Sequence, residues 1–470
     1  MNVLLINPPK YNDKNYIREG RCMQPTSSWG SFWMPLSIAY TAALLRKNGH
    51  KVKIIDCQAE NHNKFYLINI VELFQPTLII INTGFPSIKG DIHTISFLKQ
   101  SLPNVSTVAI GMYPTLIREK MLEKFIDIDY AVIGEPEWVV TNLARSIESK
   151  KKLRTVNGLI YRNGSSEIIF NDPQNFIEND INELPFPARD LLDNGAYRQV
   201  YSNKRFTHIN IARGCPYKCT FCNAPAYYGN GFRKRNIESI ILEIKECIDK
   251  FAIKTFIFWA EECTLDILFM SQLAEAIIEN GISITWYARA RVDNVNIDLL
   301  RKMKHAGCKG IGLGIESISD EIHDKTHKGI TYNQIVEAIN IAKKAEIKTT
   351  GHFVFGLPGD TETSAIESIR FARKSGLDLA QFYCAVPYPG TKYGDLAKEN
   401  GWIESFDYSR YHLAESITKN ESLSTEKIMK LRKKAYRLFY LRPRYLWNAI
   451  VIACKHKSLY PLFNFFRWVY

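Results

Sequence analysis

The chain has 470 residues, 46% of them hydrophobic and 23% charged, a composition typical of soluble globular proteins. This length exceeds what one ordinary core accommodates and predicts about three domains. Apolar stretches fall short of the roughly 18 residues that span a bilayer, and the N-terminus does not resemble a secretory signal peptide. Ten mostly scattered cysteines add to the expectation of a protein in the reducing cytoplasm.

The net charge of +13 is unevenly distributed. From Phe406 to Tyr470, thirteen Lys and Arg stand against four Asp and Glu. Aromatic residues are interleaved with these cations: Tyr436, Phe439, Tyr440, Tyr445, Trp447, Phe463, Phe465, Phe466, Trp468 and Tyr470. The pattern fits a helical cap with buried aromatics, or contact with an anionic membrane surface or a lipophilic substrate. Both interpretations stay open, and both are favoured over nucleic acid.

Residues 1–150 alternate between short β-branched runs and helical stretches. Predicted strands are residues 3–7, 52–56, 77–83, 107–111 and 130–134, with a helix at residues 35–48. This alternation predicts an α/β domain with a doubly wound parallel sheet, which binds ligands at the carboxyl ends of its strands. No G-x-G-x-x-G follows the first strand, so the dinucleotide fingerprint is absent.

Residues 151–204 are predicted to be a connector, with a hairpin at Asn163-Gly164 and a proline-stiffened crossing near Pro185 and Pro187. Over residues 205–400 six further strands are predicted: residues 206–212, 255–259, 282–287, 310–315, 349–355 and 379–385. Six such βα units predict a partial (β/α)6 TIM-type barrel with its active site at the C-terminal ends of the strands. Residues 401–470 form the basic, aromatic helical region.

Cys215, Cys219 and Cys222 have the spacing C-x₃-C-x₂-C and follow the first strand of the barrel pattern. Iron–sulfur clusters are normally held by four thiolates, so a cluster with three cysteines keeps one iron open. The spacing favours such an open site, and structural zinc is the alternative, although no fourth ligand follows Cys222 closely. The other seven cysteines are predicted to be buried bystanders.

With the cysteine loop and the six-strand pattern placed, the chain resembles the radical S-adenosylmethionine (SAM) enzymes with an N-terminal cobalamin-binding domain. The resemblance covers nearly the whole chain. It rests on the order and spacing of short motifs: Pro35-Leu36-Ser37, Gly111-Met112-Tyr113-Pro114-Thr115, Gly134-Glu135, Leu184-Pro185-Phe186-Pro187, Gly314-Ile315-Glu316-Ser317, Gly356-Leu357-Pro358-Gly359 and Pro387-Tyr388-Pro389-Gly390-Thr391. It implies a Rossmann-like cobalamin-binding domain followed by a radical SAM partial barrel.

The resemblance implies that Cys215, Cys219 and Cys222 are the metal ligands of a 4Fe–4S cluster whose open iron binds SAM. One electron, from a donor such as a flavodoxin or ferredoxin, then cleaves SAM to a 5′-deoxyadenosyl radical. Phe221 matches the aromatic residue that abuts the adenine of SAM in this family. No further catalytic residue is assigned.

Other SAM contacts implied by the resemblance lie at strand ends. Glu316 would accept hydrogen bonds from the ribose hydroxyls, and Arg291 would pair with the SAM carboxylate. Gly356 and Pro358 would bring backbone close to the adenine. Glu261 and Glu262 stand where relatives carry paired aspartates, and are candidates too. The structural alternatives are a helix cap for Glu316, an ion pair for Arg291 and a plain turn at Gly356.

Cobalamin is expected without a histidine ligand. Related folds carry D-x-H-x-x-G after the first strand, but here that loop reads Asn7-Pro8-Pro9-Lys10-Tyr11. A partial match at Asp91-Ile92-His93 follows the third strand, so His93 is predicted to be an ordinary helix residue. Many members of the subfamily lack this histidine and still bind cobalamin, which leaves the lower ligand of cobalt unassigned.

The implied function is that of a cobalamin-dependent radical SAM methyltransferase acting on an unactivated carbon. The alternative is a cobalamin-dependent radical cyclase or skeletal-rearrangement enzyme on a lipophilic substrate, such as a tetrapyrrole or hopanoid. Methylthiolation of tRNA would need three N-terminal cysteines, and only Cys22 and Cys57 precede residue 200. The alternative outside the enzymes is a non-catalytic protein that binds metal or RNA. The expected location is the cytoplasm, with membrane-surface contact through the C-terminal region.

Overall fold

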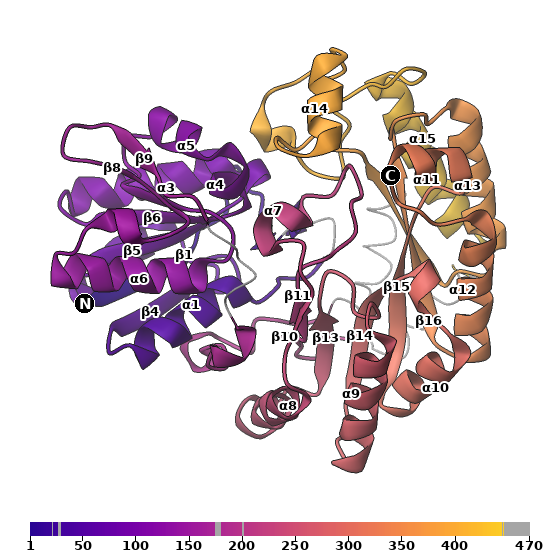
Figure 1. Cartoon of the computed structure of the whole chain (residues 1–470), viewed down its shortest axis with the longest axis horizontal. Helices are drawn as coiled ribbons and strands as arrows, with labels where there is room; N and C mark the ends of the chain where they lie inside the picture. The colour runs from indigo at the N-terminus through magenta and orange to yellow at the C-terminus, as the bar shows by residue number, and fades with distance from the viewer. Residues whose placement is uncertain (21, 27–29, 174–179, 200–201, 444, 446–470) are drawn as a thin grey trace. The chain divides into compact units, whose positions relative to one another are not determined.

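The computed structural model describes residues 1–20, 22–26, 30–173, 180–199, 202–443 and 445. The chain divides into two compact units, each built around a parallel sheet (Figure 1). The first unit comprises Met1–Tyr197, Asn223–Arg233 and Asp407–His412. The second comprises Arg198–Cys222, Lys234–Phe406 and the described residues that follow His412. Two short segments from beyond residue 220 therefore belong to the first unit.

The first unit contains a seven-stranded sheet in the order β4-β1-β5-β6-β7-β8-β9. Its parallel strands are β1 (Asn2–Asn7), β4 (Lys51–Asp56), β5 (Leu78–Thr83), β6 (Ser106–Gly111) and β7 (Tyr130–Val132). They confirm the predicted doubly wound sheet. Because successive strands are added on opposite sides of β1, the strand order reverses between β1 and β5, the usual place for a ligand crevice in such sheets.

The edge of this sheet comes from residues predicted as connector. β8 (Leu159–Arg162) and β9 (Ile168–Phe170) join it antiparallel. They confirm the hairpin predicted around Asn163-Gly164. A second hairpin, β2 (Tyr16–Glu19) and β3 (Cys22–Pro25), follows β1 and stands outside the main sheet.

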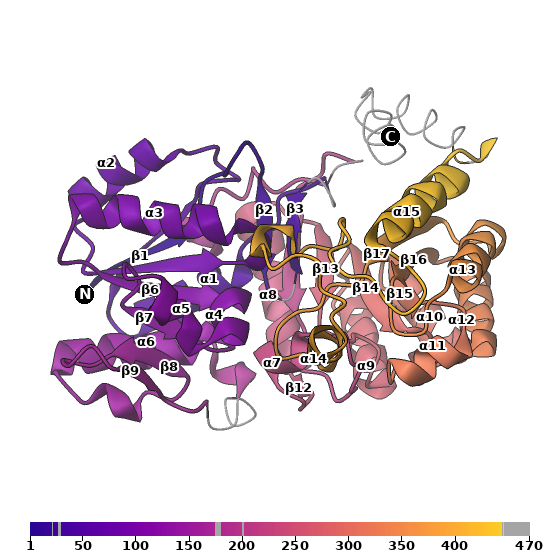
Figure 2. The same cartoon turned by 90° about the horizontal axis from the view of Figure 1, so that it is seen from above.

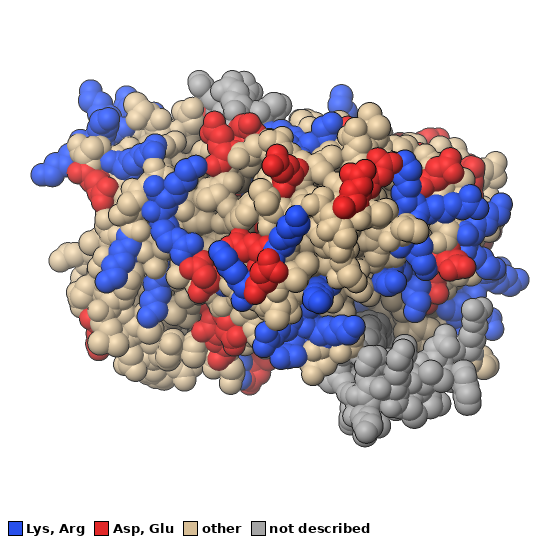
Figure 3. Space-filling model, turned by 90° about the horizontal axis from the view of Figure 1, so that it is seen from below, with Lys and Arg blue, Asp and Glu red and all other residues tan. Residues whose placement is uncertain are grey.

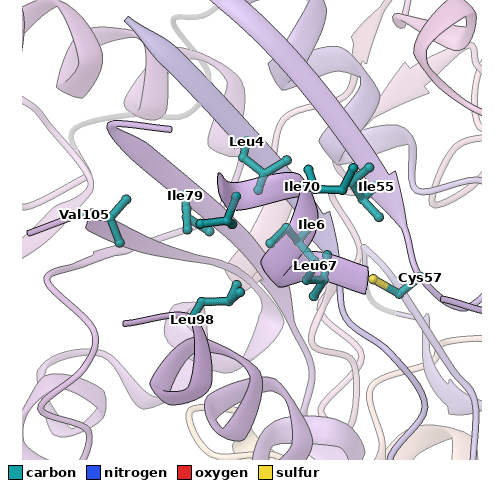
Figure 4. Close-up of a cluster of buried hydrophobic side chains, with 10 residues drawn as sticks. Leu4, Ile6, Ile55, Cys57, Leu67, Ile70, Ile79, Leu98 and Val105 are labelled. Carbon is teal, nitrogen blue, oxygen red and sulfur yellow. The ribbon is translucent and has the colours of Figure 1, made fainter. Parts of the chain in front are cut away.

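Helices cover both faces of the first sheet. In Figure 2, α2 (Lys64–Phe74) and α3 (Ile88–Ser101) lie on one side of β1 and α6 (Pro136–Ser149) on the other, where it packs on α1 (Leu36–Lys47). Short helices α4 (Met112–Ile117) and α5 (Glu119–Lys124) follow β6. Under α2 and α3, a buried cluster joins residues of three strands and two helices, including Leu4, Ile55, Leu67, Ile79 and Leu98 (Figure 4). Burial of these side chains holds the sheet and its helices together.

The second unit contains a six-stranded parallel sheet whose spatial order, β10-β13-β14-β15-β16-β17, follows the sequence. Its strands are β10 (Thr207–Asn210), β13 (Thr255–Trp259), β14 (Thr285–Arg291), β15 (Cys308–Glu316), β16 (Lys348–Phe355) and β17 (Leu379–Cys384). This arrangement confirms the predicted partial barrel. The third of these strands begins and ends later than its predicted span of residues 282–287.

Helices follow each of these strands and lie along the outer side of the curved sheet (Figure 1). They are α8 (Ile237–Phe251), α9 (Ile267–Glu279), α10 (Ile297–His305), α11 (Asp320–Lys325), α12 (Tyr332–Lys344) and α13 (Glu362–Lys374). α8 buries the stripe of Ile240, Ile244 and Cys247 that its spacing predicts. β15 alternates buried Ile311, Leu313 and Ile315 with glycines on its other face.

The C-terminal region adds α14 (Lys392–Glu399) and α15 (Thr425–Tyr440). In α15, Tyr436, Phe439 and Tyr440 are buried, and the hydroxyl of Tyr440 donates to the carbonyl of Ala380 in β17 at 2.6 Å. These three aromatics therefore act as the predicted helical cap. The later ones, from Trp447 to Tyr470, lie outside the described residues. None of the described helices is long and apolar enough to cross a bilayer.

Candidate active site

The cysteine loop follows β10 and the short strand β11 (Ala212–Arg213) at the carboxyl edge of the second sheet. Cys215, Cys219 and Cys222 are half-buried and form no disulfide. The loop is held from two sides at Thr220, whose N–H donates to the carbonyl of Thr326 and whose carbonyl accepts from the N–H of Tyr393, both at 2.9 Å. Among the described residues, no three His, Cys, Asp or Glu side chains converge on a single metal ion. The ligand role of the three cysteines remains a prediction.

Two cations lie beside this loop. Burial would lower the pKa of Lys328, but the neighbouring Glu316 and Cys219 raise it, and the net shift is upward. Burial likewise opposes the charge of Arg291, but Asp293 and then Cys219 raise its pKa overall. Lys328 and Arg291 therefore stay charged beside Cys219.

Buried polar atoms at the same edge have no hydrogen-bond partner among the described residues. They are the amide oxygen of Asn210, at the end of β10, and the hydroxyl of Thr220 within the cysteine loop. Buried polar groups are normally satisfied. Three thiols, two cations and two unsatisfied polar atoms together fit an anionic iron–sulfur cluster with a polar ligand.

Arg291, the last residue of β14, is already engaged by its surroundings. Its Nε and Nη2 donate to the two carboxylate oxygens of Asp293, both at 2.9 Å, and Nη2 also donates to the carbonyl of Lys328 at 2.8 Å. The guanidinium lies 3.7 Å from the centroid of the Tyr217 ring. Nη1 makes no hydrogen bond to the described residues, so a contact with the SAM carboxylate would fall to that nitrogen.

Glu316 ends β15 in a strained conformation. Its φ of +61° is rare for a residue with a side chain, and the pairing with β16 shifts register between Gly314 and Glu316. Its Oε1 lies 3.1 Å from Nζ of Lys328, and both side chains are largely buried. A Cβ on Gly314 would lie 3.0 Å from that Nζ, so the glycine makes room for the pair. The predicted hydrogen bonds of Glu316 to ribose remain a prediction.

Glu261 and Glu262 follow β13 at the same edge and are buried. The carboxylate of Glu262 accepts from the N–H of Thr264 at 3.1 Å and from its hydroxyl. Burial raises the pKa of Glu262 to about 7, although Thr264, Lys328 and Arg291 oppose this shift. Glu262 thus belongs to the charged cluster around Lys328. Its predicted part in the SAM site is untested.

The Gly356-Leu357-Pro358-Gly359 turn is fixed by buried side chains. The N–H of Gly356, which has a φ of +84°, donates to Asp360 Oδ2 at 2.9 Å. The hydroxyl of Tyr393 donates to the carbonyl of Gly356, and the amide of Asn420 donates to that of Leu357 at 2.8 Å. Pro358 is buried in this turn, whereas Phe221 is half-buried in the cysteine loop. The turn keeps a fixed backbone edge, which an adenine contact would require.

Sequence reasoning missed Lys328, Tyr217 and Asn294. Asn294 donates to the hydroxyl of Tyr217 at 2.9 Å, which ties the cysteine loop to the turn after β14. The position of Tyr217 between two of the cysteines could have indicated it. Lys328 follows α11 without a motif or periodic pattern, so no sequence signal places it against Glu316.

Half-buried polar side chains also line the glycine face of β15. A Cβ on Gly312 would lie 2.8 Å from Nε2 of His352, and one on Gly310 would lie 3.2 Å from the Tyr287 ring. The His352 ring stacks on that of Tyr383, and its Nδ1 lies 3.2 Å from the Tyr383 hydroxyl. This face of the sheet is therefore polar and aromatic.

In the first unit, buried glycines stand at the carboxyl edge of the sheet. Gly111 ends β6, and Gly84 and Gly134 lie one and two residues beyond β5 and β7. Gly111 has a φ of +107°, and a Cβ there would lie 2.4 Å from the carbonyl oxygen of Thr83. Only glycine fits at this position, because the ends of β5 and β6 approach each other closely there.

The switch point between β1 and β5 is filled by a buried ion pair. Arg18, from β2, donates through Nη2 to Asp91 at 2.7 Å, and the side chains are 1% and 0% exposed. Its Nε donates to Ser87 at 2.9 Å and its Nη1 to Asn7 at 3.2 Å. Asp91 therefore binds Arg18. His93 is an exposed residue of α3, as predicted.

Comparisons with known proteins identify both domains. The protein-family model described as "B12 binding domain" matches residues 26–144, and "Radical SAM superfamily" matches residues 209–372. A Pyrococcus horikoshii protein named "Uncharacterized methyltransferase PH0819" is 30% identical, covering 95% of this chain and 94% of its own length. The chain belongs to the radical SAM enzymes with an N-terminal cobalamin-binding domain. This membership confirms the predicted enzyme class and its two cofactor classes, SAM and cobalamin.

More distant members of the family have varied names. The anaerobic magnesium-protoporphyrin IX monomethyl ester cyclase of Rubrivivax gelatinosus is 25% identical and covers 88% of this chain and 75% of its own length. The hopanoid C-3 methylase of Methylococcus capsulatus is 24% identical, with 82% and 72% covered.

Two solved structures share the fold of this radical SAM enzyme. OxsB with aqua-cobalamin and SAM bound has a TM-score of 0.76 at 16% identity, covering 98% of this chain and 72% of that one. TsrM from Kitasatospora setae has a TM-score of 0.69 at 18% identity, with 86% and 77% covered.

Proposed function

We propose that this protein is a cobalamin-dependent radical SAM methyltransferase that acts on an unactivated carbon of a small, lipophilic molecule. One observation carries the proposal: both family domains occur in one chain that matches, almost end to end, a relative named as a methyltransferase. The charged groups beside the cysteine loop at the edge of the second sheet support it.

In this proposal Cys215, Cys219 and Cys222 hold a 4Fe–4S cluster, which with SAM supplies the 5′-deoxyadenosyl radical, while cobalamin supplies the methyl group. Arg291 and Lys328 keep positive charge beside the cluster ligands. A flavodoxin or ferredoxin would deliver the electron.

The residues around the cysteine loop would position SAM. Lys328 holds the Glu316 carboxylate at the end of β15. That carboxylate would accept hydrogen bonds from the ribose hydroxyls. Arg291 keeps Nη1 for the SAM carboxylate, and Phe221 and the backbone at Gly356 and Pro358 would flank the adenine. Glu261 and Glu262 would line the same edge.

A lipophilic substrate is supported by the names of relatives, since hopanoids and protoporphyrins are largely apolar ring systems. The exposed side of α15 supports contact with a membrane surface, because cations there adjoin two exposed leucines, Leu438 and Leu441. The cations are Lys430, Lys433, Lys434 and Arg437. Such a side is attracted to anionic lipid headgroups. On the face shown in Figure 3, by contrast, Lys and Arg are interspersed with Asp and Glu.

Membrane contact can be tested by flotation with phosphatidylcholine vesicles that do or do not contain phosphatidylglycerol. The wild type is expected to float with the anionic vesicles only, and K433E/K434E to remain at the bottom. K343E/K344E is the matched control, because Lys343 and Lys344 are an exposed pair at the end of α12. Equal loss of binding in both variants would indicate a general charge effect and contradict the proposal.

Methyl transfer can be tested after anaerobic reconstitution with iron, sulfide and hydroxocobalamin. The enzyme is then incubated with a reductant, methyl-labelled SAM and lipid or tetrapyrrole extracts, and the products are analysed by mass spectrometry. Label in a carbon-bound methyl group of a product is the expected result. Formation of 5′-deoxyadenosine with extract-dependent products that carry no label would contradict methyl transfer.

That contrary outcome would favour the second candidate function, a radical cyclase or skeletal-rearrangement enzyme. Its support is the similarity to magnesium-protoporphyrin cyclases, such as that of Rubrivivax gelatinosus. A cyclase would consume SAM and return a product with changed ring connectivity and no added methyl group.

A further inference from the structure

The segment Asp407–His412 packs on the first unit although it follows the whole barrel in sequence. Asp407 pairs with Lys89 of α3 at 3.1 Å. The rings of Tyr408 and Tyr411 lie 5.2 and 5.9 Å from that of Phe85, which follows β5. This segment therefore covers part of the carboxyl edge of the first sheet.

Tyr113, in the short helix α4 that follows β6, joins the same aromatic cluster. Its ring lies 5.1 Å from that of Phe85 and 5.7 Å from that of Tyr408. Tyr113 is only 1% exposed and Tyr408 is half-buried. Burial, and to a lesser degree the proximity of Tyr408, raises the pKa of Tyr113, and burial raises that of Tyr408. The two phenols thus lie close together in a water-poor environment.

Neither phenol hydroxyl has a hydrogen-bond partner among the residues that the structure describes. Neither hydroxyl is fully enclosed by the protein, and the hydroxyl of a largely buried tyrosine usually finds a partner. Phenylalanine at these positions would keep the ring contacts. The hydroxyls therefore indicate a ligand that is absent from the protein alone.

The chemistry of the family cofactor matches this requirement. Doubly wound sheets bind ligands at the carboxyl ends of their strands, and this sheet is the B12-binding unit. The corrin ring of cobalamin carries carboxamide groups around its rim, whose oxygens accept hydrogen bonds. We propose that Tyr113 and Tyr408 donate hydrogen bonds to peripheral carboxamides of cobalamin, so that the segment Asp407–His412 forms part of the cofactor site.

The test is titration of the full-length protein with hydroxocobalamin, followed by absorbance. Y113F and Y408F are each expected to raise the Kd roughly three- to tenfold, and the double variant more, because each lost hydrogen bond contributes modestly. Y66F is the matched control: Tyr66 belongs to α2 of the same unit, and its ring stacks on that of His62 with centroids 3.6 Å apart. Unchanged affinity in the double variant would overturn the proposal.

Thermal unfolding separates this role from simple packing. Without cobalamin, Y113F should be at least as stable as the wild type, since it removes an unsatisfied hydroxyl. With saturating cobalamin the wild type should become the more stable protein. A Y113F variant that is less stable without cobalamin would indicate a structural role and contradict the proposal.

Cobinamide, which keeps the carboxamides but lacks the nucleotide, identifies the contact. The same loss of affinity is expected with cobinamide as with cobalamin. A loss seen only with cobalamin would place the hydroxyls against the nucleotide and overturn the assignment. All these measurements report cofactor binding, so they stand apart from the test of methyl transfer.

Discussion

The first sheet fills the crevice at its carboxyl edge with a buried ion pair, whereas the second gathers two cations, several carboxylates and unsatisfied polar groups at the same edge. Arg18 and Asp91 neutralise each other at the β1–β5 switch point. At the second edge, Arg291 pairs with Asp293 and Lys328 pairs with Glu316. Both cations also lie near Glu262, and both lie near Cys219 of the half-buried cysteine loop. The comparison teaches that two sheets of similar build acquire different chemistry from a few loop residues. The first edge is closed by a paired arginine and aspartate, whereas the second keeps charged and unsatisfied groups beside the cysteine loop.

The largest effect is expected from removal of a thiol at the second edge. C219A should lose the absorbance of the 4Fe–4S cluster and should form no detectable 5′-deoxyadenosine from SAM, since the cluster needs each of its cysteines. C247A is the control, because Cys247 is buried in α8 away from the loop. Iron content, absorbance and product analysis are the measurements. An active, iron-replete C219A would refute the ligand assignment.

The next effect tests the ion pair of the first edge. R18M leaves the Asp91 carboxylate buried and should lower the free energy of unfolding by about 3–5 kcal/mol. The double variant R18M/D91L should recover part of that loss, because it leaves no buried charge. R291M should lower the free energy of unfolding by a smaller amount, because its partner Asp293 is 18% exposed and stays partly hydrated. Urea unfolding of the cofactor-free proteins measures all three, and equal losses in R18M and R291M would contradict the contrast between the edges.

A smaller effect concerns the pH dependence of stability. Burial raises the pKa of Glu262 to about 7 from the ordinary 4.5, so the folded protein binds the proton more tightly than the unfolded chain. The resulting stabilisation is complete below about pH 4.5 and is lost as the pH rises through 7. E262Q should therefore gain stability over the wild type, by about 3 kcal/mol at pH 8. Denaturant unfolding from pH 5 to 8 tests this, and a constant difference between the proteins would contradict it.

The smallest effect is expected from the cation that holds Glu316. K328M should weaken SAM binding by about tenfold, roughly the effect of one lost charged hydrogen bond, with the cluster still assembled. K325M is the control, because Lys325 pairs with Glu321 on the exposed side of α11. Equilibrium dialysis with SAM distinguishes the two. Equal affinities would show that Lys328 does not organise the site.

Local patterns predicted most of the fold, because each strand and helix is marked by its own spacing of apolar residues. The bounds of β14 were harder to predict, because the strand ends in Arg289 and Arg291, charged residues that do not mark a buried strand. Contacts between residues far apart in the sequence leave no comparable local pattern. Nothing in the residues around Lys328 indicates Glu316, and nothing near Tyr408 indicates Phe85. The cysteine loop could be singled out because its spacing is local, and the ligand role of its cysteines stays a prediction.

The membership of Asp407–His412 in the first unit has a consequence for biosynthesis. A ribosome makes the strands of the cobalamin-binding sheet first, yet the last segment of that unit emerges only after the entire barrel. The N-terminal unit therefore reaches its final form late, and a chain shortened before residue 407 would lack one wall of it. Maturation of the enzyme is in this sense tied to completion of the polypeptide.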